Sequence, residues 1–169
     1  LIAEAIKDVQ PSIIGLSISK ESLQAMDEHI ESNSELPEPA NFEEDMYIEG
    51  LSEFGEVIRP PQCYSEAWKL AEKSGLPIRG LDMDDDQFTT AFCKHISSIE
   101  MIRQGRCNKK WARHGYISES ARDFVVEWDN VINWLRGYKD LERAREQWID
   151  KGISKLSKKH EKVLAIIEY

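Results

Sequence analysis

Three short apolar runs constrain the fold of this chain more than any other feature. They are residues 12–18 (SIIGLSI), 77–81 (PIRGL) and 163–167 (VLAII), and each has the length of a buried strand. The segments between them carry apolar residues at helical spacing, and strands that alternate with helices pair in parallel in a sheet covered on both faces. The sequence therefore predicts a helix-rich α/β fold with a small, mainly parallel sheet of few strands flanked by several helices.

The helices are predicted from apolar stripes and from residues that favour helix ends. One helix precedes the first strand and stops at Pro11, and Ser19 caps the next. A long helix is predicted from Phe88 to Gly105, with a buried face of Phe88, Phe92, His95, Ile96, Ile99 and Ile102. The remaining helices are expected around residues 46–54, 64–75, 120–135 and 140–156, with residues 106–117 between them as a basic turn.

Length favours a single domain over residues 1–169, with an acidic mobile loop at residues 31–43. Leu1 lies inside an apolar pattern, and the chain stops directly after the third apolar run. We therefore expect the domain to be incomplete at both ends. A strand that precedes Leu1 is expected to pair with residues 12–18.

Charge and cysteine content exclude several classes of function. The net charge of −9 argues against a nucleic-acid partner, because that binding relies on Lys and Arg to neutralise phosphates. No run approaches the roughly 20 apolar residues that cross a bilayer. The three cysteines include no CxxC pair, which disfavours disulfides and a structural zinc site. A soluble protein in the reducing cytoplasm is expected, and it could form a homo-oligomer.

The segment Asp82-Met-Asp-Asp-Asp86 follows the second predicted strand, at the edge where open α/β sheets bind ligands. Asp82, Asp84 and Asp86 alternate, so their carboxylates could converge on a divalent metal such as magnesium. Asp82 and Asp84 are accordingly candidate catalytic residues. The alternative is that these acids cap the following helix and interact with its dipole, as acids at helix starts commonly do.

Arg145 lies within the apolar stripe of the last helix, among Leu141, Trp148, Gly152 and Leu156. A charge in such a stripe requires a partner, because burying it alone is costly. One interpretation is a pocket arginine that binds a carboxylate or a phosphate of a ligand. The other is a snorkelling side chain or an internal ion pair, with Asp82 or Asp84 as its partner.

Two further features have a structural and a functional interpretation. His95 lies in an apolar stripe, where a histidine is more often a hydrogen-bonded core residue than a catalyst. Residues 103–113 include Arg106, Lys109, Lys110 and Trp111, a combination that can bind anions or nucleic acid. The acidity of the rest of the chain favours a solvated basic segment instead.

Several segments together resemble the TraB/PrgY family, part of a superfamily of metal-dependent hydrolases that includes the TIKI and GumN proteins. The matching segments are IAEAIKDVQPSIIGLSI, EAWKLAEKSGLPIRGLDMD, FTTAFCKHISSIEMI and LERAREQWIDKGISKLSKKHEKVLAIIEY. In the family the first ends in a strand of the form VAVEL, the second in DRD, and the last continues to a glycine–histidine motif. The family's two histidine motifs would lie before Leu1 and after Tyr169.

The resemblance implies metal-assisted hydrolysis of a peptide or related bond, but key positions depart from the family pattern. The family's strand glutamate falls at Ser17, which is neither a carboxylate ligand nor a base, and its DRD arginine falls at Met83. A divergent or non-catalytic member with a regulatory or binding role is therefore expected, with a small ligand or a peptide as partner. The alternatives are a metal-dependent, peptidase-like hydrolase and a magnesium-dependent phosphohydrolase that uses Asp82 and Asp84.

Overall fold

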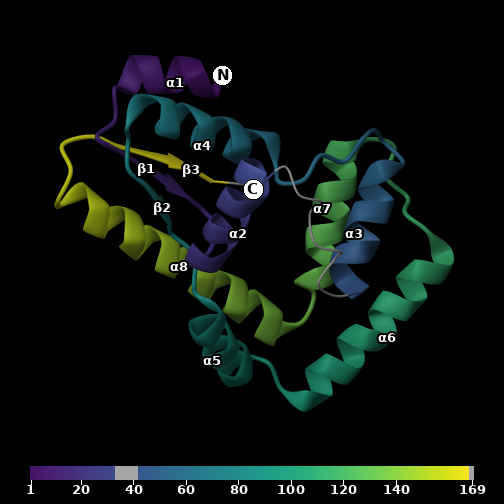
Figure 1. Cartoon of the computed structure of the whole chain (residues 1–169). Coiled ribbons are helices and arrows are strands. Elements are labelled where there is room, and N and C mark those ends of the chain that lie inside the picture. Colours follow the sequence, from purple (N-terminus) through teal and green to yellow (C-terminus); the bar gives the residue numbers. More distant parts are fainter. Residues whose placement is uncertain (33–41, 168–169) are drawn as a thin grey trace. The chain divides into compact units, whose positions relative to one another are not determined.

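A computed structural model describes residues 1–32 and 42–167 of the chain (Figure 1). These residues form eight helices and three strands, as the sequence predicted for a helix-rich α/β fold. The chain divides into two compact units. Of the described residues, 1–32, 58–89 and 144–167 form the sheet unit, and 42–57 and 90–143 form the helical unit.

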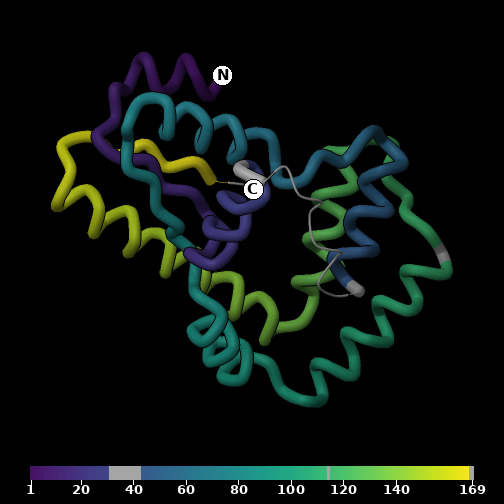
Figure 2. The backbone as a smooth tube through the Cα atoms, in the orientation of Figure 1, coloured from purple at the N-terminus to yellow at the C-terminus, as the bar shows by residue number. Residues whose placement is uncertain are grey.

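The sheet unit contains three parallel strands in the order β2-β1-β3. They are β1 (Ile13–Leu16), β2 (Ile78–Gly80) and β3 (Val163–Ile166), each inside an apolar run that predicted it. β1 and β3 come from opposite ends of the sequence and run side by side (Figure 2). The expectation that an upstream strand pairs with residues 12–18 is wrong, because β2 and β3 occupy both edges of β1.

One face of the sheet is covered by α4 (Gln62–Ser74), with α1 (Ile2–Val9) packed beyond it and α2 (Lys20–Ser32) at its margin (Figure 1). Ile14 and Leu16 project from β1 toward Tyr64 and Trp68 of α4. The spacing of Tyr64, Ala67, Trp68 and Ala71 predicted this buried face. Gly75 ends α4 in the left-handed conformation, as expected of a C-cap glycine.

The other face of β1 packs against Leu81 and the second half of α8 (Arg136–Ser157). A Cβ atom on Gly15 would lie 2.7 Å from Cδ1 of Leu81, and one on Gly152 would lie 3.3 Å from its Cδ2. Leu81 therefore fills the space above the glycine of β1, and Gly152 lets α8 approach it. All four residues of β1 are buried, as expected for the central strand of a covered parallel sheet.

The helical unit contains α3 (Phe42–Ser52), the end of α5 (Asp85–His95), α6 (Ser98–His114), α7 (Ala121–Ile132) and the start of α8. Its core is aromatic: Phe124 is fully buried, and its ring centroid lies 4.6 Å from that of Tyr116. The Tyr116 hydroxyl donates to the Met46 carbonyl at 2.8 Å. Burial, together with the charges of nearby glutamates, raises the pKa of Tyr116, so its hydroxyl keeps its proton.

The long helix predicted from Phe88 to Gly105 is wrong. Two helices occupy this region, and α6 begins at Ser98 because Ser97 and Glu100 form a capping box. Gly105 lies inside α6, which continues to His114, so most of the predicted basic turn is helical. Phe88, Ile99 and Ile102 are exposed, which shows that the apolar stripe is not one buried face.

Three other boundaries also differ from the predictions. α8 begins at Arg136, so Asp140 lies within its second turn instead of capping it. α2 continues to Ser32 and α3 begins at Phe42, and the acidic loop predicted at residues 31–43 otherwise lies outside the described residues. α7 starts as expected, with the Ser120 side chain accepting a hydrogen bond from the Asp123 amide.

In the part of the chain that the structure describes, no helix combines the length and apolar character that a membrane span requires.

Candidate functional site

The candidate site lies where the chain leaves the carboxyl ends of β1 and β2. The two departing segments run side by side and are joined by backbone hydrogen bonds. The Leu81 amide donates to the Leu16 carbonyl at 2.9 Å, and the Asp82 amide donates to the Ile18 carbonyl at 3.1 Å. A Cβ atom on Gly80 would lie 2.7 Å from the Ser19 carbonyl oxygen. Only glycine allows this approach. The close backbone contact places Asp82 at the edge of the sheet that the sequence predicted.

Asp82 is held through both oxygens of its carboxylate. Oδ1 accepts a hydrogen bond from the Met83 amide at 2.7 Å, and Oδ2 lies 2.5 Å from Nη2 of Arg145 on α8. The Asp82 side chain is only 9% exposed, and that of Arg145 is one-third exposed. Arg145 therefore has the internal ion pair that was one of its two predicted roles. Each oxygen keeps one lone pair, but a metal ion bound there would lie beside the Arg145 guanidinium and be repelled by its charge.

Asp84 is the N-cap of α5. Its Oδ1 accepts from the Gln87 amide at 2.8 Å, while the Gln87 side chain accepts from the Asp84 amide at 3.1 Å. This reciprocal pair is a capping box with Asp and Gln in the two positions. Asp86 is exposed in the first turn of α5, where its charge suits the helix dipole. The capping interpretation of these acids thus describes the geometry of Asp84 and Asp86.

The structure does not bring the three alternating carboxylates together. Among residues 1–32 and 42–167, no three His, Cys, Asp or Glu side chains are grouped as a metal site would require. Ser17, which the resemblance aligns with a glutamate, has its Oγ 2.7 Å from the Tyr64 hydroxyl oxygen. Met83, at the position of the family's arginine, is buried. Ser17 is therefore held by a neutral hydrogen bond, and Met83 is packed in the interior.

The other sequence candidates belong to the helical unit. His95 is the last residue of α5 and is partly buried, and Cys93 is exposed on the same helix. The basic residues from Arg103 to Arg113 lie on α6. None of the three cysteines forms a disulfide.

A buried polar network in the helical unit was not predicted. Gln104, 1% exposed, donates to Asn108 at 3.0 Å and accepts from the Trp134 indole nitrogen at 2.8 Å. Asn108, also buried, donates to Glu43 of α3 at 2.6 Å. Their spacing of four residues is a signal for a shared helix face. That signal is visible only once the helix is known to continue past Gly105.

Comparison of the chain with protein-family models, with curated proteins and with solved structures gave no match. The TraB/PrgY resemblance therefore stays a prediction.

Proposed function

We propose that this chain is a divergent, non-catalytic TraB/PrgY-like domain that acts by binding a small ligand or a peptide. The observation that carries this proposal is the ion pair of Asp82 with Arg145, in which one carboxylate oxygen lies against the guanidinium while the other accepts from the Met83 amide. A metal ion on this carboxylate would lie next to a second positive charge, which disfavours metal binding at Asp82. In this chain the pair fixes α8 to the segment that follows β2.

Two further contacts support a structural role for this edge of the sheet. Asp84 uses its carboxylate to cap α5, and Ser17 contributes a hydroxyl where the family pattern has a carboxylate. A hydroxyl that is bonded to Tyr64 can neither act as a general base near neutral pH nor replace an anionic ligand. We also propose a cytoplasmic location, which is consistent with three cysteines outside disulfides.

Turnover assays on the purified chain test this proposal. A panel of peptides and a generic phosphate ester are incubated with the wild-type chain in the presence of Mg²⁺, Mn²⁺ or Zn²⁺. We expect no hydrolysis above the buffer rate with any of these metals. The two hydrolase alternatives make the opposite prediction, because both require Asp82 or Asp84 to bind the metal.

Two matched variants identify the source of any activity that is observed. Asp82→Asn removes the charge of the candidate ligand, and Asp84→Asn does so while preserving an N-cap side chain. Hydrolysis that the wild-type chain supports and that both folded variants lose would overturn the proposal. Hydrolysis that persists unchanged in both variants would show that these carboxylates have no catalytic role.

A further inference from the structure

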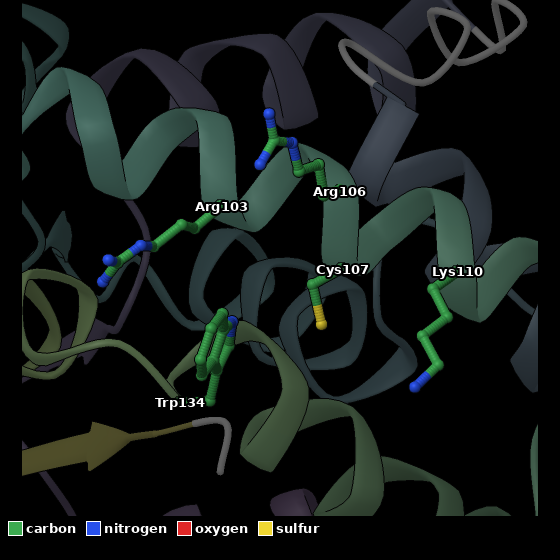
Figure 3. A pocket seen from close by; sticks show the side chains of 5 residues that line it. All are labelled: Arg103, Arg106, Cys107, Lys110 and Trp134. Atoms are coloured by element: carbon green, nitrogen blue, oxygen red, sulfur yellow. The ribbon is translucent and has the colours of Figure 1, made fainter.

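A shallow, open groove in the helical unit brings three basic side chains close to an exposed tryptophan. It has a volume of about 480 Å³ and is lined by side chains of α6 and by one residue that precedes α8: Arg103, Arg106, Cys107, Lys110 and Trp134. In Figure 3 the Cys107 sulfur lies between Trp134 and Lys110, and the Arg106 side chain extends away from Trp134. Pockets of this size accommodate small organic ligands.

Two of the three cations of the groove are free of ion pairs within the described part of the chain and are available to a ligand. Among the described residues, Arg106 and Lys110 form no ion pair, whereas the charge of Arg103 acts on the Glu100 carboxylate and helps to lower its pKa. Arg103 and Lys110 are seven positions apart on α6, which corresponds to about 10 Å along the helix axis. Guanidinium and ammonium groups distributed over this length suit an elongated anion such as a chain of phosphates.

The aromatic wall of the groove is held in one orientation. Trp134 is 47% exposed, yet its indole nitrogen donates to Gln104 at 2.8 Å. Gln104 is in turn fixed by Asn108 and by the Val131 carbonyl. Buried polar side chains are costly unless their hydrogen bonds are made. The network of Gln104 and Asn108 on α6 therefore holds the indole ring in place. A ring that is fixed before binding loses less entropy when a planar ligand stacks on it.

We propose that this groove binds a nucleoside phosphate, with the base stacked on Trp134 and the phosphates held by Arg103, Arg106 and Lys110. The combination of a fixed aromatic face and a row of exposed cations selects for a ligand that is both planar and polyanionic. The net charge of −9 disfavours a long nucleic acid, whose many phosphates would meet the acidic remainder of the chain. The site is independent of the carboxylates discussed above, so it does not rest on the proposed loss of catalysis.

Calorimetric titration of the full chain with ATP, adenosine and inorganic tripolyphosphate tests the two halves of the site. We expect ATP to bind at least tenfold more tightly than either fragment. Trp134→Ala should weaken ATP binding about tenfold and leave tripolyphosphate binding unchanged. The double variant Arg106→Ala/Lys110→Ala should weaken the binding of both ATP and tripolyphosphate. Lys109→Ala/Arg113→Ala removes the same charge from exposed positions of α6 outside the groove and should leave the affinity for ATP unaltered.

Cysteine alkylation of the wild-type chain gives a readout that needs no substitution. Bound ATP should slow alkylation of Cys107, while exposed Cys93 reacts at its original rate. The proposal is overturned by equal affinity for ATP and tripolyphosphate, by an equal loss in the Lys109→Ala/Arg113→Ala control, or by the absence of ATP binding at millimolar concentration. Tight binding of a single-stranded oligonucleotide without mononucleotide binding would overturn it in favour of a nucleic-acid partner.

Discussion

Arg145 and Asp82 are 63 positions apart in the sequence, and their side chains meet at 2.5 Å between Nη2 and Oδ2. Replacing Arg145 with Met keeps the length of the side chain but leaves the nearly buried Asp82 carboxylate without its cation. We expect a loss of about 1–3 kcal/mol in the free energy of unfolding, below the full cost of breaking a buried pair because Arg145 is partly exposed. Urea denaturation measures this loss.

A double-mutant cycle with Asp82→Asn separates the pair from other contacts of the two residues. The coupling energy should be about 1 kcal/mol or more. A coupling energy near zero would show that the ion pair does not stabilise the junction between α8 and β2.

The N-cap of α5 gives a second prediction. Asp84→Ala removes the side chain that accepts from the Gln87 amide and should cost about 0.5–2 kcal/mol of stability. Asp84→Asn should cost much less, because Asn caps helices as well as Asp does. Thermal unfolding of both variants measures the difference. Equal losses in the two variants would mean that the charge of Asp84, and not its capping bond, is what matters.

Two glycines in the helical unit should respond in opposite directions to alanine. A Cβ atom at Gly137 would lie 2.5 Å from the His95 carbonyl oxygen, so Gly137→Ala should cost about 1–3 kcal/mol. A Cβ atom at Gly105 would meet nothing within 4 Å, so Gly105→Ala inside α6 should gain about 0.5–1 kcal/mol. Destabilisation by Gly105→Ala would contradict the continuation of α6 through this position.

Glu100 makes the stability of the helical unit depend on pH. Hydrogen bonds from the Ser97 amide, then from the Gly137 amide and the Ser97 hydroxyl, hold the pKa of the Glu100 carboxyl below its ordinary value of 4.5. A lowered folded-state pKa means that the stabilisation is complete above about pH 4.5 and is lost as the pH falls through the folded-state value.

Glu100→Gln should therefore be less stable than the wild-type chain at pH 7, and the difference should shrink at pH 3. Urea midpoints at the two pH values measure it. A difference that is constant with pH would show that the charge of Glu100 does not strengthen these bonds.

The sequence predicted the sheet well because its strands are short apolar runs bounded by polar or turn residues. The parallel pairing followed from the helices between them, and Ser120, Gly75 and the buried face of α4 also matched expectation. The order of the strands could not be predicted, since apolar content alone does not say which strand is central. The need for glycine at Gly15 and Gly152, which both lie against Leu81, can be recognised only once that order is known.

The break between α5 and α6 was missed because apolar residues continue at helical spacing from Phe88 to Ile102. The capping signal Ser97-x-x-Glu100 lay in the same stretch and was the better guide. Misplacing the end of the helix at Gly105 also hid the Gln104–Asn108 pair and the groove.

At the carboxyl edge of the sheet, Asp82 and Arg145 could both be identified from the sequence as candidate site residues. The sequence could not decide whether they face a ligand or each other, because that depends on how α8 packs.

The central claim is that the carboxylates at this edge hold the fold together and do not bind a catalytic metal. Thermal unfolding with and without 1 mM Mg²⁺, Mn²⁺ or Zn²⁺ tests it most directly. A metal with a dissociation constant of about 10 µM would add about 2.7 kcal/mol at this concentration, enough to raise the midpoint by several degrees. We predict no shift with any of the three metals. A stabilisation by metal that disappears in Asp82→Asn would contradict the claim.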